Sequence, residues 1–278
     1  LGAVQLPKTI REAYLDLGWT RKKSTPLVDT AWEIAYDQFV LPASGKVWNG
    51  KPSEAGKTTF EVDENTGALK SLCLDGEELL ASPVTISLFR PATDNDNRDR
   101  MGAKLWRKAG LHTLTQKVVS LKESKTSATA QVNILNVTGK KVGDATLEYT
   151  LNHNGSLKVQ TTFQPDTTWV KSIARLGLTF EMNDTYGNVT YLGRGEHETY
   201  IDRNQSGKIG IYTTTPEKMF HYYVIPQSTG NRTDVRWVKL ADDSGKGCWI
   251  ESDSPFQFSA LPFSDLLLEK ALHINDLE

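Results

Sequence analysis

The feature that most constrains the fold of this chain is a series of short segments in which apolar and polar residues alternate. Such alternation is typical of β-strands with one buried and one exposed face. The turns between segments include Asn65-Thr66-Gly67, Asp75-Gly76 and Asn154-Gly155, whose residues tolerate the positive φ of a tight hairpin. We therefore predict strands at residues 12–20, 30–41, 58–62, 69–74, 83–89, 116–122, 127–137, 144–152, 156–163 and 174–181.

Helical patterns are few. One short helix is predicted at residues 101–110, and Ser264 is the expected N-cap of a second at 265–272, where Asp265 complements the helix dipole. A polar run with glycines at 42–56 is interpreted as a linker or long loop. Because short strands with hairpin turns fill most of the remaining chain, we predict an all-β fold, a large antiparallel β-sandwich.

Composition narrows the class of partner. The 278 residues carry 32 Lys and Arg against 34 Asp and Glu, so the formal net charge is −2. This balance argues against a nucleic-acid footprint or a basic membrane-binding patch and favours neutral ligands. Apolar runs are shorter than a membrane-spanning helix requires, and no signal-peptide pattern is present. Cys73 and Cys248 lie in apolar, strand-like surroundings and are expected to be buried free thiols.

Two runs hold the most unusual chemistry, Tyr191 to Arg203 and Asn231 to Trp237. They combine arginines, carboxylates, amides and aromatic rings, the groups that bind sugar hydroxyls and stack on sugar rings. A third polar run follows Leu88. The candidate carbohydrate-contacting or groove-lining residues are Arg90, Asp94, Asn95, Asp96, Arg194, His197, Glu198, Tyr200, Asp202, Arg203, Asn231, Arg232, Asp234, Arg236 and Trp237.

Each run also has a purely structural interpretation. Gly193 and Gly195 are expected to allow positive φ or a close approach between chain segments. Arg194 is expected to hold a carboxylate, such as Glu198 or Asp202, in a buried network. The run 94–97 alternates oxygen ligands like a calcium loop but lacks its glycine and final glutamate, so a capping turn or a contact with another domain is favoured.

These runs support a family resemblance. Residues 190–250, with Gly193-Arg194-Gly195-Glu196-His197-Glu198 and Gly230-Asn231-Arg232-Thr233-Asp234, resemble the C-terminal small-chain domain of bacterial β-galactosidases of glycoside hydrolase family 2. The run Leu88-Phe89-Arg90-Pro91-Ala92-Thr93-Asp94-Asn95-Asp96 is similar to another motif of that family. Residues 31–39 resemble the junction from a preceding immunoglobulin-like domain of that family. Near the end of the chain, residues 255–260 and 269–273 are also similar to the family.

The resemblance implies a galactose mutarotase-like supersandwich. It implies three parts: 1–41 as the end of an immunoglobulin-like domain and its junction, 42–56 as a linker or loop, and 57–278 as the small-chain domain, truncated at its C-terminus. In the family, two glutamates in an upstream (β/α)₈ barrel carry out hydrolysis. No catalytic residue is therefore expected here, and the chain alone is expected to be inactive.

The chain also departs from the family pattern. The family's Asp-Asp-Ser-Trp motif, whose tryptophan reaches the active site, is not matched by Asp242-Asp243-Ser244-Gly245. Glu196, Thr199 and Ile201 differ from the family's residues. The start at Leu1 and the stop at Glu278 suggest a piece of a longer protein. Transfer by resemblance is safest for Arg194, His197, Glu198, Tyr200, Asp202 and Arg203.

The resemblance predicts an accessory domain of a β-galactosidase that hydrolyses terminal β-D-galactosides, supporting the active-site rim and assembly. Its expected partners are a galactoside through the longer enzyme, the upstream barrel and further copies in a homo-oligomer, with no nucleic acid or membrane. No cofactor is expected in this chain, while Mg²⁺ or Na⁺ is expected in the longer enzyme. Bacterial periplasm and cytoplasm both remain open. The alternative is a standalone carbohydrate-binding or aldose-epimerase-like sandwich, in which His197 would move protons.

Overall fold

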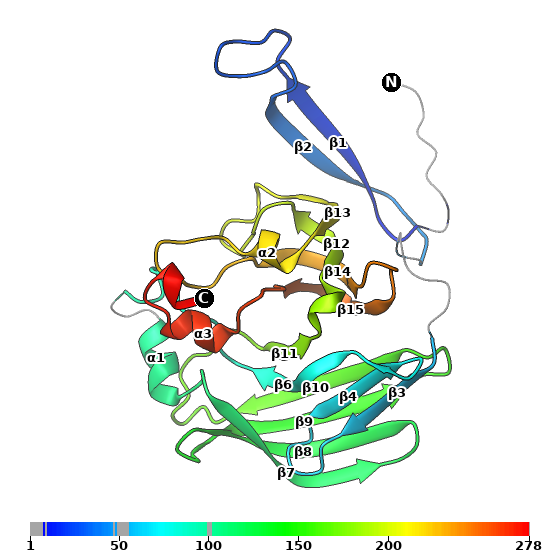
Figure 1. The fold of residues 1–278 in the computed structure, drawn as a ribbon, viewed down its shortest axis with the longest axis vertical. Coiled ribbons are helices and arrows are strands. Elements are labelled where there is room, and N and C mark those ends of the chain that lie inside the picture. Colours follow the sequence, from blue (N-terminus) through cyan, green and yellow to red (C-terminus); the bar gives the residue numbers. More distant parts are fainter. Residues whose placement is uncertain (1–7, 9, 47, 49–55, 99–101, 278) are drawn as a thin grey trace.

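The computed structural model describes residues 8, 10–46, 48, 56–98 and 102–277, and it is built almost entirely from antiparallel sheets (Figure 1). This confirms the predicted all-β class. The strands are β1 (Ala13–Thr20), β2 (Glu33–Leu41), β3 (Thr58–Val62), β4 (Leu69–Leu74), β5 (Glu77–Glu78), β6 (Leu80–Ser87), β7 (Leu114–Glu123), β8 (Ser127–Asn136), β9 (Lys141–Leu151), β10 (Leu157–Pro165), β11 (Gly177–Met182), β12 (Asn188–Gly195), β13 (Lys208–Thr214), β14 (Arg232–Ala241) and β15 (Gly247–Phe258). The helices are α1 (Gly102–Ala109), α2 (Pro216–Met219) and α3 (Asp265–Lys270), with 3₁₀ turns at Asp184–Tyr186 and Ile274–Leu277.

Two sheets enclose the largest core. One has the strand order β10-β9-β8-β7 and the other β11-β6-β4-β3. The alternation in β8 explains the packing, because Ala130, Val132 and Ile134 are buried while Gln131 and Asn133 face away from the core. Residues of both sheets belong to one buried apolar cluster, which identifies this half of the molecule as a sandwich.

A third sheet, β13-β12-β14-β15, forms a separate layer with its own apolar clusters. Val189 and Tyr191 of β12 are buried on one face of this sheet, and Leu192 is buried on the other. Trp237 of β14 stacks on Trp249 of β15, with ring centroids 4.2 Å apart. This layer carries both runs singled out by sequence.

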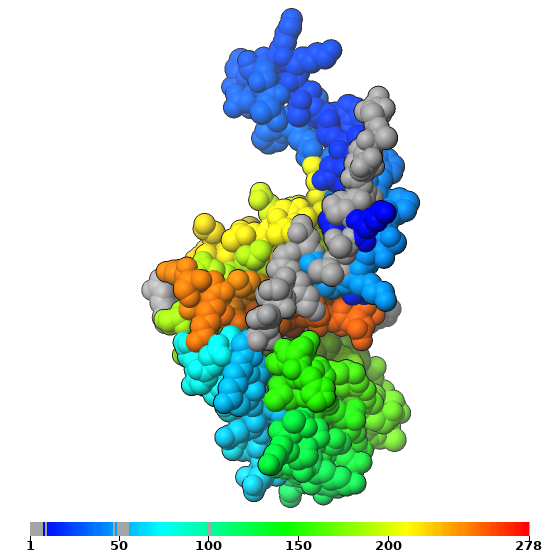
Figure 2. Space-filling model, turned by 90° about the vertical axis from the view of Figure 1, so that its right-hand side faces the viewer, coloured from blue at the N-terminus to red at the C-terminus, as the bar shows by residue number. Residues whose placement is uncertain are grey.

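The hairpin β1–β2 extends away from the rest of the molecule (Figures 1 and 2). Its strands pair in register from Ala13 with Leu41 to Gly18 with Tyr36, and a bulge follows Trp19. Strands are therefore present in both N-terminal segments where alternation predicted them.

Local signals explain the turns and helix ends. Positive φ occurs at Gly67, Asp75, Gly76 and Gly155, which confirms the chemistry predicted for the three hairpin turns. Ser264 Oγ accepts the Leu267 N–H at 3.2 Å, which confirms the N-cap of α3.

Two expectations need correction. The sequence did not predict β12 to β15. For β12 the reason is that both of its faces are buried, so its Tyr-Leu-Gly-Arg-Gly run does not alternate. Cys73 and Cys248 are free, as expected, but they are half-buried rather than buried.

Candidate functional site

Many of the candidate residues belong to one of two networks of polar contacts. The first network joins the turn 93–97, the turn 196–203 and the segment 220–230. The second joins β12 and β14 to the hairpin β1–β2.

Glu198 is the centre of the first network. Its carboxylate accepts hydrogen bonds from Arg203 Nη2, the Tyr223 hydroxyl and the Thr229 hydroxyl, and from the Gly230 N–H at 2.9 Å. Burial acts to raise the pKa of Glu198, but hydrogen bonds from Tyr223, Arg203 and Gly230 outweigh it and hold that pKa below its ordinary value. An ionised Glu198 carboxylate with four hydrogen-bond donors therefore holds the turn 196–203 against the segment 220–230.

The turn at 93–97 joins the same network. Asp96 forms a two-pronged ion pair with Arg90, at 2.6 and 3.1 Å, and accepts the Thr93 N–H at 2.9 Å. The Asp94 N–H donates to Gln227 Oε1 at 3.3 Å, which ties this turn to the segment 220–230. Because the Asp96 carbonyl also accepts the Ala103 N–H at the start of α1, the turn caps this helix, as the sequence favoured.

Tyr200 anchors the remaining side of the network. Its hydroxyl lies 3.2 Å from Ser228 Oγ, the Arg203 guanidinium lies 4.9 Å from its ring centroid, and burial raises its pKa to about 12. Around these contacts lie large exposed apolar side chains. We name the exposed residues Ile201, Arg203, Tyr222, Val224 and Ile225 the loop face.

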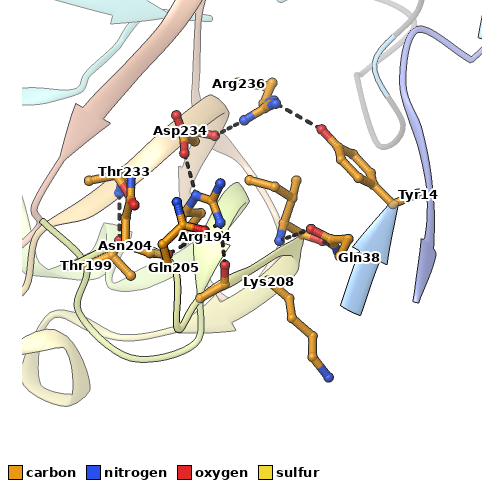
Figure 3. Close-up of polar contacts among 12 residues, drawn as sticks. Tyr14, Gln38, Arg194, Thr199, Asn204, Gln205, Lys208, Thr233, Asp234 and Arg236 are labelled. Carbon is orange, nitrogen blue, oxygen red and sulfur yellow. Dashed lines mark hydrogen bonds and ion pairs between the residues drawn. The ribbon is translucent and has the colours of Figure 1, made fainter. Parts of the chain in front are cut away.

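Arg194 and Asp234 begin the second network (Figure 3). Arg194 Nε donates to Asp234 Oδ2 at 2.5 Å, and its Nη1 donates to the Gly207 carbonyl at 2.8 Å. Asp234 has φ of 50°, a conformation that aspartate tolerates better than most residues. The prediction that Arg194 holds a carboxylate is therefore confirmed, but the named partners Glu198 and Asp202 were wrong, since the carboxylate is Asp234 on the neighbouring strand β14.

Arg236 continues this network into the hairpin. Its guanidinium donates to the Asp234 carbonyl and to the Tyr14 hydroxyl at 2.9 Å (Figure 3). It also donates to Glu12 Oε2 at 2.8 Å. Tyr14 in turn donates to Glu12 at 2.7 Å, and burial together with this carboxylate raises the pKa of Tyr14 to about 12. A continuous set of polar contacts thus connects β12 with β1.

Further contacts bind the hairpin to β13. Gln38 donates to the Ile209 carbonyl and accepts its N–H, both at 2.8 Å, so its amide pairs with the strand backbone. Glu33 accepts from Lys208 at 2.7 Å, and the Tyr36 hydroxyl donates to the Gln205 carbonyl. One face of the hairpin is therefore polar and bound to the third sheet.

The other face of the hairpin is apolar and exposed. Leu15 pairs across the hairpin with Phe39, and Leu17 and Trp19 follow on the same face. Leu17 is 39% exposed and Trp19 49%. An antiparallel ribbon with one apolar face is typical of a sheet that packs against a further layer.

Some candidates are too buried to touch a ligand. Arg232 is 3% exposed and donates to the Tyr191 hydroxyl at 2.8 Å and to the Gly230 carbonyl at 3.1 Å. Trp237 is 2% exposed. The prediction that these two line a groove was wrong, because both side chains build the interior of the third sheet. Asn231, which donates to the Thr199 carbonyl at 2.8 Å, also serves the fold.

The glycines of the Gly-Arg-Gly run serve close packing. A Cβ added to Gly193 would lie 2.8 Å from Val235 Cγ2, and one added to Gly195 would lie 2.4 Å from the Tyr191 hydroxyl. Of the two alternatives drawn from sequence, close approach is the one observed.

His197 lies on the surface, where its Nε2 is 2.9 Å from Ser206 Oγ. In the described part of the chain its ring is hydrogen-bonded to this hydroxyl rather than to a carboxylate, so the geometry gives no support to an acid–base pair. Asp202, Asp94 and Asn95 are likewise exposed.

The acidic candidate residues are dispersed or already paired in the described part of the chain. Among the described residues, no group of three or more His, Cys, Asp or Glu side chains could hold an ion. The Asp96 carboxylate is already engaged by Arg90 and Thr93.

Sequence reasoning missed several members of both networks. Tyr223, Ser228 and Thr229 were not singled out, although the run 221–230 combines aromatic residues with Pro226 and Gly230 directly before a predicted cluster. Glu12 and Gln38 were also missed. The sequence indicated only that each occupies a polar position of an alternating strand, which does not predict a contact with another sheet.

None of the helices in the described ranges is long and apolar enough to cross a membrane.

Comparisons with known proteins identify the family of this chain. Residues 54–278 match the family described as "Beta galactosidase small chain". A β-galactosidase of Priestia megaterium is 30% identical over 288 residues, covering 96% of this chain and 27% of that protein. The β-galactosidase BgaC of Bifidobacterium adolescentis is 29% identical over 255 residues, covering 87% of this chain and 24% of that protein.

A third relative is similar over most of this chain. A β-galactosidase of Kluyveromyces lactis is 27% identical over 287 residues, covering 92% of this chain and 27% of that protein. The chain thus spans about a quarter of the length of these relatives. On the match over 54–278, the chain belongs to the β-galactosidase small-chain family.

Proposed function

We propose that this chain is the accessory C-terminal region of a β-galactosidase that hydrolyses terminal β-D-galactosides. Hydrolysis would be carried out by paired glutamates in a catalytic barrel that lies outside this chain. The family match and the relatives, each about four times as long as the aligned part, support this assignment. By resemblance alone, we also propose that the longer enzyme is a homo-oligomer and that any Mg²⁺ or Na⁺ it uses is bound outside this chain.

The observation that carries the proposal is the amphipathic hairpin β1–β2. An isolated two-stranded hairpin is marginally stable in water, and an exposed apolar face adds a cost that further layers of sheet would remove. Leu15, Leu17, Trp19 and Phe39 present such a face. We therefore propose that residues 1–41 complete an immunoglobulin-like domain, that 42–56 connect, and that 57–278 are the small-chain domain.

The loop face supports a contact with the catalytic portion. Val224 is 88% exposed, and it lies with Tyr222 and Ile201 on two segments that Glu198 joins. Exposed aromatic and aliphatic residues beside an arginine are typical of protein interfaces. Because the Glu198 contacts hold this surface in place, we propose that it supports the rim of the active site.

Expression of this chain alone and of the longer polypeptide that contains it tests the proposal. We expect no hydrolysis of nitrophenyl β-galactoside by the isolated chain and full activity from the longer polypeptide. Turnover by the isolated chain that is abolished in His197→Ala would contradict the proposal, because it would place the hydrolytic chemistry in this chain.

A further inference from the structure

The outer face of the sheet β10-β9-β8-β7 holds a hollow of ≈300 Å³ that lies apart from both networks. In Figure 1 this sheet lies at the end of the molecule remote from β1–β2. A bulge between Val118 and Ser120 breaks the register of β7 with β8. The bulged residue, Val119, is exposed and lines the hollow on the β7 side.

The polar lining comes from two rows of cross-strand neighbours. In the first row Gln131 of β8 pairs with Thr146 of β9, and Thr146 pairs with Thr162 of β10. In the second row Asp144 of β9 pairs with Gln164 of β10. Because neighbouring residues across antiparallel strands lie about 4.5–5.5 Å apart, these five side chains present a compact set of polar groups.

The hollow offers both donors and acceptors but little net charge. Asp144 is neutralised by Lys141, whose ammonium lies 2.7 Å from its carboxylate. Gln131 uses its amide oxygen to accept from Ser120 at 3.1 Å. Within the described ranges, the side chains of Thr146, Thr162 and Gln164 have no hydrogen-bond partner. A ligand that fits must therefore both donate and accept hydrogen bonds and must be uncharged.

We propose that this hollow binds one neutral pyranose unit of a glycan. Sugar hydroxyls match two amides, two threonine hydroxyls and a carboxylate, and Val119 gives an apolar wall for the ring. Ligand pockets usually measure about 300–1,000 Å³, so this hollow suits a single ring rather than a longer segment. The inference is independent of the proposed accessory role, because it concerns a different face of the molecule.

Saturation-transfer NMR on the 278-residue chain tests the proposal, with methyl glycosides of galactose, glucose and mannose as probes. We expect saturable binding of at least one of them. Gln131→Ala and Gln164→Ala should each weaken it about three- to tenfold, the worth of one hydrogen bond. Gln160→Ala is the matched control, since this exposed glutamine lies on the same strand and face as Gln164 but outside the hollow, and it should leave binding unchanged.

Three results would overturn the proposal. The first is the absence of saturable binding by every probe up to roughly tens of millimolar. The second is equal weakening by Gln160→Ala and Gln164→Ala. The third is competition by sodium sulfate at constant ionic strength, which would identify an anion site. Because the mutated side chains are exposed, an unchanged thermal midpoint verifies that each variant is folded.

Discussion

The hairpin β1–β2 and the sandwich differ in what holds them in place. The sandwich encloses a continuous apolar core in which Ile134, Leu147 and Tyr149 are almost fully buried. The hairpin instead contacts the third sheet, through Gln38, Tyr14 and other polar side chains, and turns its apolar face outward. Since apolar burial is the main favourable contribution to folding, the sandwich is expected to be the stable unit, and the hairpin is expected to open more readily.

Removing core volume from the sandwich should produce the largest effect. Ile134→Ala is expected to lower the free energy of unfolding by about 2–5 kcal/mol, because the side chain is fully buried and the cavity cannot collapse completely. Urea denaturation measures this change. The hairpin control Leu17→Ala should cost less than about 1 kcal/mol. Equal losses for the two variants would show that the hairpin shares the cooperative core.

Breaking the Glu198 network should have the next largest effect. Glu198→Ala leaves Tyr223 and the Gly230 N–H without their acceptor and is expected to cost about 1–3 kcal/mol in the same assay. The matched control is Glu196→Ala, an exposed glutamate two residues away that should change stability little. An equally large decrease in the free energy of unfolding for Glu196→Ala would contradict the assignment of Glu198 as the centre of the network.

Acid should weaken the same turns more than the hairpin. The pKa values of Glu198 and Asp96 lie below their ordinary 4.5 and 3.8, so both carboxyls bind fewer protons when the protein is folded. Their contribution is complete above those ordinary values and is lost as pH falls through the lowered ones. We expect the urea concentration at the unfolding midpoint to decrease as the pH is lowered below about 4.5. In Glu198→Gln this decrease with pH should be smaller. An unchanged acid slope in this variant would contradict the pKa argument.

Loosening the hairpin should have the smallest effect on global stability. Gln38→Ala removes both hydrogen bonds to Ile209 and is expected to cost about 0.5–1.5 kcal/mol at most, because water can replace them. Amide hydrogen exchange in β1 should nevertheless accelerate, while exchange in β8 should not. The control is Asp37→Ala, a neighbouring change on the opposite face of the hairpin. Equally accelerated amide exchange of β1 in the Asp37→Ala variant would contradict the claim that Gln38 docks the hairpin.

The same contrast explains how far the sequence could predict this structure. β8 was predicted to within one residue because Ala128 to Asn136 alternates between core and solvent. β12 was missed because residues on both of its faces are buried. The unusual polar residues around Arg194 and Glu198 marked the location of both networks, while the prediction that they contact a sugar stays a prediction. Their pairings could not be deduced, because Arg194 meets Asp234 through strand pairing across 40 positions and a positive φ, neither of which leaves a local pattern.

The role of Glu198 follows the same rule. Its partner Arg203 was among the candidates predicted from sequence. Tyr223, Thr229 and Gly230 belong to a segment that packs against Glu198 only through tertiary contacts. Residue types in a run therefore identified the chemistry, and the topology decided which groups meet.

The central claim is that the apolar face of the hairpin is covered in the longer enzyme. Leu17→Cys, labelled with a maleimide and followed by mass spectrometry of the modified peptide, tests it most directly, with the exposed turn residue Val137→Cys as the control. The account predicts fast labelling of Cys at 17 in the isolated chain and labelling slower by at least about tenfold in the longer polypeptide, with little change at 137. Equal labelling at 17 in both proteins would contradict it.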